Sequence, residues 1–222
     1  MRLELKSELE KTIRDENNIR FKMYYFLEET EKSIDFMVSQ ILGQYNRLEY
    51  KAAILTIIKE LCKNAVEANL KKIFFDDIEI KIENDFQYKK GKERFEEELK
   101  NKTLLETAEL AKEKGLYAEL NLDYNPHRII INVINNRMLW PIEEKEIQDN
   151  SKKAHKYNNI LSFYKEVKKN KNIPKNGITL IMLLLKSENH DAKFFTIEKI
   201  NAKNETLTSM KIIFPLSREY YK

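Results

Sequence analysis

The sequence predicts an α+β protein, a two-layer sandwich in which a mixed, mainly antiparallel sheet carries helices on one face. Several short runs alternate apolar and polar residues, which is typical of half-buried strands. Other runs repeat apolar residues every three to four positions, which is typical of helices with one buried face. Most of the strand-like runs fall in pairs separated by short turns, and this favours antiparallel pairing.

The composition favours a cytoplasmic globular protein. The chain has 222 residues, 42% of them hydrophobic, enough for one substantial core. Its net charge of +4 does not indicate a nucleic-acid-binding protein. The single cysteine, Cys62, excludes a disulfide framework and is typical of a reducing compartment. No run approaches the roughly 18 apolar residues of a membrane-spanning helix, so we expect no membrane insertion.

The N-terminal part is expected to hold a helix, then a strand and a second helix. Residues 1–17 are interpreted as a separate helix, and 18–222 as one domain. A thin apolar stripe would pack that first helix on the body or on a second copy: Leu5, Leu9 and Ile13. The alternation from Ile19 to Leu27 predicts a strand. Thr30 is then a candidate N-cap for a helix that ends at Gly43.

The strongest helical pattern runs from Leu48 to Leu70. Its apolar residues recur at helical spacing: Ile54, Ile57, Ile58, Leu61, Ala65 and Ala68. Glu60, Asn64 and Glu67 fall at i, i+4 and i+7, and form a polar stripe at the edge of that apolar face. Taken alone, this stripe is either a solvated helix flank or part of a ligand site.

Three further regions follow this helix. Residues 73–83 are interpreted as a strand, although their start also suits the tail of the helix, and the charged residues 83–114 as a helical insertion. Residues 142–176 predict polar helices and 177–186 an apolar helix. Two hairpins complete the sheet, built from the alternating residues 116–122 with 128–134, and 192–199 with 209–216.

Four segments occur in the order that characterises one ATP-binding family. They are ELCKNAVEA (60–68), INVINNRMLW (131–140), NGITLIMLLLK (176–186) and LTSMKIIFP (207–215). The first resembles that family's N box, and the others stand where it has its Asp-Asn-Gly-x-Gly, Gly-x-Gly-Leu-Gly and Gly-Thr motifs. From about Ile19 to Leu216 the chain thus resembles the histidine kinase-like ATPase domain (GHKL, or Bergerat fold) of histidine kinases, anti-sigma-factor kinases and gyrase.

The resemblance implies ATP and Mg²⁺ as cofactors and a role for each matching residue. Glu60 would be the catalytic base or orient a water molecule, and Asn64 would be the metal ligand, since an amide oxygen suits Mg²⁺. Asn135 takes the place of the adenine-binding Asp and would accept a hydrogen bond from the adenine amino group. The other nucleotide-binding positions are those of Asn136, Gly177, Thr179 and Thr208.

Departures from the family pattern imply that nucleotide binding is weak or lost. The neutral side chain of Asn135 accepts a weaker hydrogen bond than a carboxylate does. Family glycines, which let a ligand approach the backbone, are replaced by Arg137, Leu139, Thr179 and Leu207. Asn135 and Asn136 also suit a plain turn, and Gly177 a plain helix start.

Residues 142–176 occupy the position of the family's ATP lid, and positive charge gathers in their second part. Residues 151–176 contain Glu166 as their one acid and eight lysines: Lys152, Lys153, Lys156, Lys165, Lys168, Lys169, Lys171 and Lys175. The segment is therefore +7, and the other residues sum to −3 because the whole chain is +4. It could hold an anionic ligand over the pocket, contact an acidic partner, or be a solvated loop.

No histidine precedes His127, so we do not expect this chain to phosphorylate itself on the hairpin histidine of a sensor kinase, and its layout is nearest to anti-sigma-factor kinases. We expect a signalling or regulatory protein that binds a protein partner and does not phosphorylate itself. One alternative is a non-enzymatic interaction module whose pocket is filled by Arg137, Leu139 and Trp140 and which forms a homodimer through its N-terminal helix. Another is an active ATP-dependent serine kinase, so the sequence leaves enzymatic activity open.

Overall fold

The computed structural model describes residues 10–15, 18–101, 104–169, 177–202, 205–217 and 220. Their sheet has five strands in the order β1-β2-β3-β5-β4, and all four pairings are antiparallel. The strands are β1 (Asn18–Met23), β2 (Ala118–Asn125), β3 (Arg128–Asn135), β4 (Phe195–Ala202) and β5 (Glu205–Pro215). Both predicted hairpins, β2–β3 and β4–β5, are confirmed.

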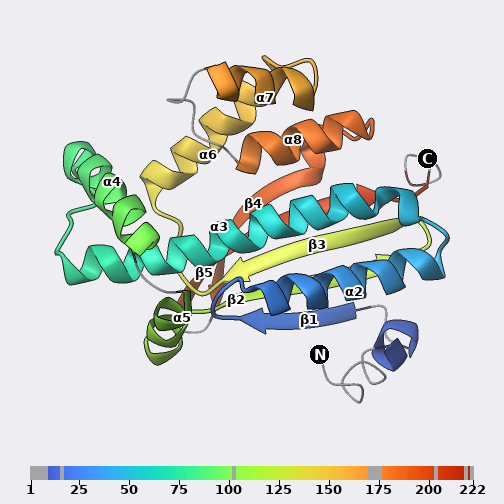
Figure 1. The fold of residues 1–222 in the computed structure, drawn as a ribbon, viewed down its shortest axis with the longest axis horizontal. Coiled ribbons are helices and arrows are strands. Elements are labelled where there is room, and N and C mark those ends of the chain that lie inside the picture. Colours follow the sequence, from blue (N-terminus) through green and yellow to red (C-terminus); the bar gives the residue numbers. More distant parts are fainter. Residues whose placement is uncertain are drawn as a thin grey trace.

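Helices cover one face of this sheet, with α3 lying along the central strands (Figure 1). The helices are α2 (Glu28–Gln44), α3 (Lys51–Asp77), α4 (Asp85–Asn101), α5 (Leu104–Glu113), α6 (Pro141–Ala154), α7 (Ile160–Lys169) and α8 (Gly177–Ser187). Short 3-10 turns occur at Leu48–Tyr50 and Ala192–Phe194. The predicted fold class, an α+β two-layer sandwich, is confirmed. Among the described helices, none combines the length and the apolar character needed to cross a bilayer.

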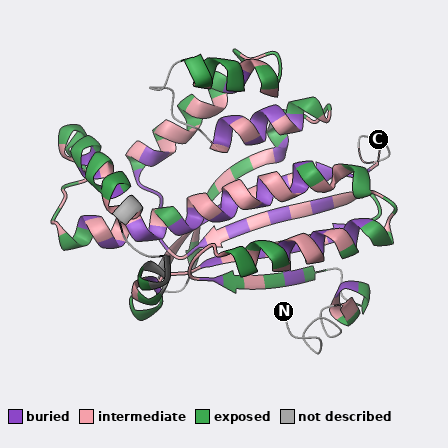
Figure 2. Cartoon of the chain, viewed as in Figure 1, coloured by how far each residue is buried: buried purple, intermediate pink, exposed green. Residues whose placement is uncertain are grey.

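The core lies between α3 and the sheet, as the alternation of burial shows (Figure 2). On β2, Leu120 and Leu122 are fully buried, whereas the intervening Asn121 is partly exposed. The register places Leu120 opposite Val133 of β3, which is also fully buried. Each such side chain contributes about 1.5–3 kcal/mol through removal from water. A one-residue shift of register would turn this set outward, so the pattern fixes the pairing.

The N-terminal residues that the structure describes, 10–15, are helical. Ile13 is buried, and its carbonyl accepts a hydrogen bond of 3.0 Å from the hydroxyl of Tyr124. The apolar stripe thus packs this segment on the body of the protein. The other members of the stripe, Leu5 and Leu9, lie outside the described residues.

The predicted strand over residues 73–83 is wrong. α3 continues to Asp77, and turns without sheet pairing follow. The reason is aromatic packing at the end of the helix: Phe75 stacks on Trp140 with ring centroids 5.5 Å apart and meets Tyr88 edge to face at 5.7 Å. These long-range contacts stabilise the helical alternative of a segment whose pattern suits both structures.

Two boundaries at the N-terminal side also differ from expectation. β1 ends at Met23, so the alternation that continues to Leu27 is not strand. α2 begins at Glu28 with Leu27 as its N-cap, and Thr30 lies inside its first turn. Acidic residues in that turn interact favourably with the helix dipole: Glu28, Glu29 and Glu31.

Within the charged residues 83–114, the described part is largely helical, as predicted, and forms α4 and α5. α4 packs on the end of α3 through Phe95, whose ring lies 5.8 Å from that of Phe74. The packing is close at Gly91, where a Cβ would lie 3.1 Å from Phe75. After α5, Gly115 has φ +68°, the left-handed conformation that favours glycine, and the chain turns into β2.

Candidate functional site

A cleft of about 460 Å³ opens between α3, α4, α6, α8 and the adjacent ends of β3 and β5. This volume is within the roughly 300–1,000 Å³ of small-molecule sites. Four of the residues that the sequence motifs single out line it: Asn64, Asn135, Gly177 and Thr208. They come from four different elements, so the fold brings together what the motif order predicts.

Glu60 and Asn64 project from α3 toward the first residue of α8. A Cβ on Gly177 would overlap the Oε2 atom of Glu60 and lie 3.4 Å from Nδ2 of Asn64. A larger residue at the start of α8 would therefore displace the Glu60 carboxylate. The unpaired N–H groups of a helix N-terminus attract anions, and here the Glu60 carboxylate already lies beside them.

Asn135, the last residue of β3, is buried with 2% of its surface exposed. Its Nδ2 donates to the carbonyl of Ala65 at 3.5 Å and to Oδ1 of Asn69 at 3.4 Å, both long contacts. Its own Oδ1 is buried and accepts no hydrogen bond from the residues that the structure describes. An unsatisfied buried acceptor costs about 1–3 kcal/mol. Because this Oδ1 atom is closed off from solvent, a ligand donor would reach it after a movement of the Asn135 side chain.

Thr208 lies opposite Asn135 in the register of β3 and β5. Its hydroxyl donates to the carbonyl of Arg137 at 2.7 Å and so fixes the turn that leaves β3. Thr208 is buried and, like Asn135, lines the cleft.

Asn136 and Thr179 have other roles. Asn136 donates to the carbonyl of Gly115 at 2.8 Å and accepts from the N–H of Tyr117 at 2.6 Å, so it joins two turns. Thr179 donates to the carbonyl of Asn150 at 3.1 Å and links α8 to α6. Neither residue is among those that line the cleft.

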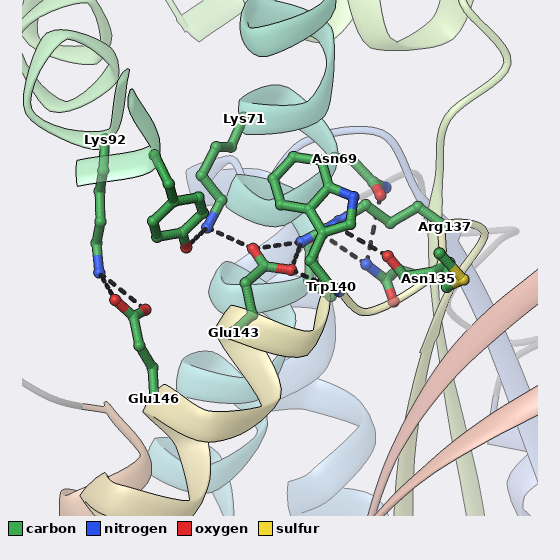
Figure 3. A network of polar contacts seen from close by, with 11 residues as sticks. Asn69, Lys71, Lys92, Asn135, Arg137, Trp140, Glu143 and Glu146 are labelled. Atoms are coloured by element: carbon green, nitrogen blue, oxygen red, sulfur yellow. Dashed lines mark hydrogen bonds and ion pairs between the residues drawn. The ribbon is translucent and has the colours of Figure 1, made fainter. Parts of the chain in front are cut away.

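A buried ionic cluster, which the motifs do not predict, forms one wall of the cleft (Figure 3). Both carboxylate oxygens of Glu143 accept from Nη2 of Arg137, at 2.6 and 2.5 Å. Nζ of Lys71 lies 2.5 Å from Oε1 of Glu143. The side chains of Arg137, Glu143 and Lys71 are only 2%, 7% and 13% exposed.

The cluster holds two cations and one anion, so it carries a net positive charge beside the cleft. Burial alone would raise the pKa of Glu143, but the charges of Lys71 and Arg137 outweigh it and lower that pKa. Burial lowers the pKa of Lys71, against the opposing effect of Glu143. Lys71 continues the polar stripe of α3, four residues after Glu67, and this spacing is the one sequence signal that could have indicated it.

The cleft is open, although glycines of the related motif are replaced. Arg137 lies over the ring of Trp140, with its guanidinium carbon 4.5 Å from the ring centroid, and is held there by Glu143. Leu139 is buried in the wall. Trp140 stacks on Phe75 and does not line the cleft. These side chains shape the wall and leave the volume between Asn64 and Thr208 free.

α4 supplies a second wall that the sequence did not predict. Lys92 donates to both carboxylate oxygens of Glu146 on α6, each at 3.0 Å, and so bridges the cleft (Figure 3). Phe95 and Glu96 of α4 also line it. Glu67 also lines the cleft, and burial raises its pKa, with a smaller contribution from the negative charges of Glu60 and Glu96.

The metal-binding capacity of the site is small. Within the described ranges, no group of three or more His, Cys, Asp or Glu side chains could hold a metal ion. Asn64 would supply one oxygen ligand from the protein. This suits Mg²⁺ in a nucleotide complex, because that ion takes most of its ligands from phosphates and water.

Comparisons with known proteins assign no chemistry to this site. No protein-family model matches the chain, and no solved structure matches it. A protein of Treponema pallidum (strain Nichols), described only as an uncharacterized protein, is 29% identical over 150 residues, or 67% of this chain. The match spans 28% of that protein, so the related region lies within a much longer chain.

Proposed function

We propose that this chain is a cytoplasmic regulatory protein of a signalling pathway and that its cleft binds ATP with Mg²⁺ weakly, without autophosphorylation. The observation that carries the proposal is the buried carbonyl of Asn135, which has no donor among the described residues and lies at the cleft. An adenine amino group would supply that donor. The cleft volume of about 460 Å³ is also suitable for a ligand of nucleotide size.

The other site residues would contribute through the places that they occupy around the bound nucleotide. Asn64 would bind Mg²⁺, and the N-terminus of α8 at Gly177 would face the phosphates. Bound Mg²⁺ neutralises phosphate charge, which the carboxylates of the lining that form no ion pair with a described residue, such as that of Glu67, would otherwise repel. Glu60 lies beside Gly177, where it would orient water, or would compete with phosphate for the helix N-terminus. That competition is one physical reason for weak binding.

A second candidate function is that of a non-enzymatic interaction module. The ionic cluster of Arg137, Glu143 and Lys71 favours this alternative. The carboxylate of Glu143 is satisfied by Arg137, Lys71 and the N–H of Trp140 without any ligand. Such a wall stabilises the fold by itself. The cleft would then be the remnant of a nucleotide-binding site, and the protein would act through partner contacts on its surface.

A thermal-shift titration with Mg·ATP distinguishes the two. Binding raises the free energy of unfolding by RT ln(1 + [L]/Kd), about 2.7 kcal/mol at a hundredfold excess over Kd. We expect the shift at millimolar ATP, dependent on Mg²⁺ and absent in Asn64→Ala. The control, Asn158→Ala, changes an exposed asparagine between α6 and α7 and should keep the wild-type shift. No shift in the wild type would leave the interaction module as the better account.

A further inference from the structure

Lysines on the end of α6 and on α7 form a surface that we call the basic surface. Its members are all exposed: Lys152, Lys153, Lys156, Lys165, Lys168 and Lys169. Residues 152–169 hold one acid, Glu166, so their charge is +5 from six lysines minus one acid, with His155 neutral. Within the described part of the chain, none of the six forms an ion pair, whereas lysines elsewhere do, such as Lys59 with Glu31 and Lys199 with Glu144.

Two large apolar side chains lie exposed among these charges. Leu161 is 70% exposed and Tyr164 is 41% exposed. With Lys165 and Lys168 they occupy positions i, i+3, i+4 and i+7 of α7, which share one helix face. The opposite face packs inward through Phe163, which is buried against Tyr157 with ring centroids 5.1 Å apart. The exposed face of α7 is visible along the edge of the molecule in Figure 2.

The basic surface does not belong to the cleft. Of its six lysines, only Lys153 lines the cleft, and the five others lie outside it. The five other lysines therefore do not contact a ligand held in the cleft.

We propose that the basic surface binds an acidic protein segment that carries apolar residues. Uncompensated positive charge attracts such a segment and speeds association, while Leu161 and Tyr164 provide apolar contacts that slow its dissociation. This proposal goes beyond nucleotide binding and does not depend on it.

A membrane surface fits less well. A helix that lies in a bilayer keeps its apolar face free for lipid, but α7 uses that face, including Phe163, to pack on its own protein. Only two apolar side chains remain outside. A nucleic acid also fits less well, because the cations are all lysine, without the arginine that reads bases and phosphates in a bidentate manner.

The test uses a fluorescein-labelled synthetic helix peptide, rich in glutamate with leucine along one face, and fluorescence anisotropy without nucleotide. We expect saturable binding by the wild type at physiological salt. Lys165→Glu/Lys168→Glu should weaken it by about tenfold or more, and Leu161→Ser/Tyr164→Ser should weaken it while leaving the salt dependence intact. The matched control Lys112→Glu/Lys114→Glu, a charge reversal of exposed lysines at the end of α5, should bind as the wild type does.

The contradicting results are equally direct. Absence of binding, or equal binding by the Lys165 and Lys168 variant, would overturn the proposal. So would equal affinity for a peptide with serine in place of leucine. Tighter binding to phosphatidylserine vesicles or to duplex DNA than to the peptide would assign the surface to those partners instead. All of these variants change exposed side chains. Lys165→Gln/Lys168→Gln is a second double variant, in which the two charges are neutralised and not reversed.

Discussion

Glu60 on α3 and Gly177 at the start of α8 are packed so closely that a Cβ at position 177 would overlap the Glu60 carboxylate. The contact joins the polar stripe of α3 to a helix N-terminus and places Asn64 beside both. The geometry of the cleft at this end therefore depends on a residue without a side chain.

Gly177→Ala should destabilise the protein by about 0.5–1.5 kcal/mol, because the methyl group pushes the flexible Glu60 side chain out of its preferred rotamer. Urea denaturation measures the change. Gly43→Ala is the matched control, since nothing lies within 4 Å of its Cβ position in α2, and alanine there should stabilise by about 0.5–1 kcal/mol. If Gly177→Ala/Glu60→Ala fails to recover stability relative to Gly177→Ala, the contact with Glu60 is not the cause.

Glu143→Ala should cost about 3–5 kcal/mol, because it leaves Lys71 and Arg137 buried without their anion. Glu146→Ala is the matched control on the same helix. Its partner Lys92 is 38% exposed, and such an ion pair contributes about 0–1 kcal/mol. Chemical denaturation of both variants checks the difference. Equal losses in the free energy of unfolding would mean that the buried cluster around Glu143 contributes no more than the exposed ion pair of Lys92 and Glu146.

Acid should weaken the wild type more steeply than Glu143→Gln. The folded-state pKa of Glu143 is lowered, so its contribution is present above its unfolded pKa of about 4.3 and is lost as pH falls through the folded pKa. The wild type should have the larger free energy of unfolding, and its advantage over Glu143→Gln should be greatest at pH 7 and should shrink below about pH 4. A difference that stays constant across this range would show that Glu143 does not titrate as described.

Asn135→Asp should tighten ATP binding, because a carboxylate accepts a hydrogen bond about twice as strong as a neutral carbonyl does. It should also destabilise the unliganded protein, because an oxygen then replaces the Nδ2 that donates to Ala65 and Asn69. Competition with a fluorescent ATP analogue measures the change in Kd, and GTP serves as the comparison ligand. Tightening should be confined to ATP, whose 6-amino group donates where guanine has a carbonyl oxygen. An equal gain for GTP, or none for ATP, would remove Asn135 from base recognition.

The fold was largely predictable because its strands and its main helix have distinct periodicities. β2 and β3 alternate cleanly on one buried face, and the apolar residues of α3 keep helical spacing. Residues 73–83 could not be assigned in this way, since their sequence suits either structure. Contacts of Phe75 with Trp140 and Tyr88, far away in the sequence, decide the outcome.

The site was predictable only where a motif marks it. Asn64, Asn135, Gly177 and Thr208 were found through the order of their segments. Lys71 and Glu143 could not be paired from the sequence, because their ion pair forms between α3 and α6 and each residue also suits an exposed helix position. The same holds for Lys92 and Glu146, which pair only because α4 packs beside the cleft.

The central claim is that the cleft holds Mg·ATP at Asn135, and a calorimetric titration tests it most directly. The account predicts a saturable heat with one site per chain for the wild type, and none for Asn135→Leu, which removes the carbonyl while keeping a similar volume. Circular dichroism would verify that the variant is folded. A folded wild type that gives no binding heat at millimolar Mg·ATP, or an Asn135→Leu variant that binds as the wild type does, would contradict it.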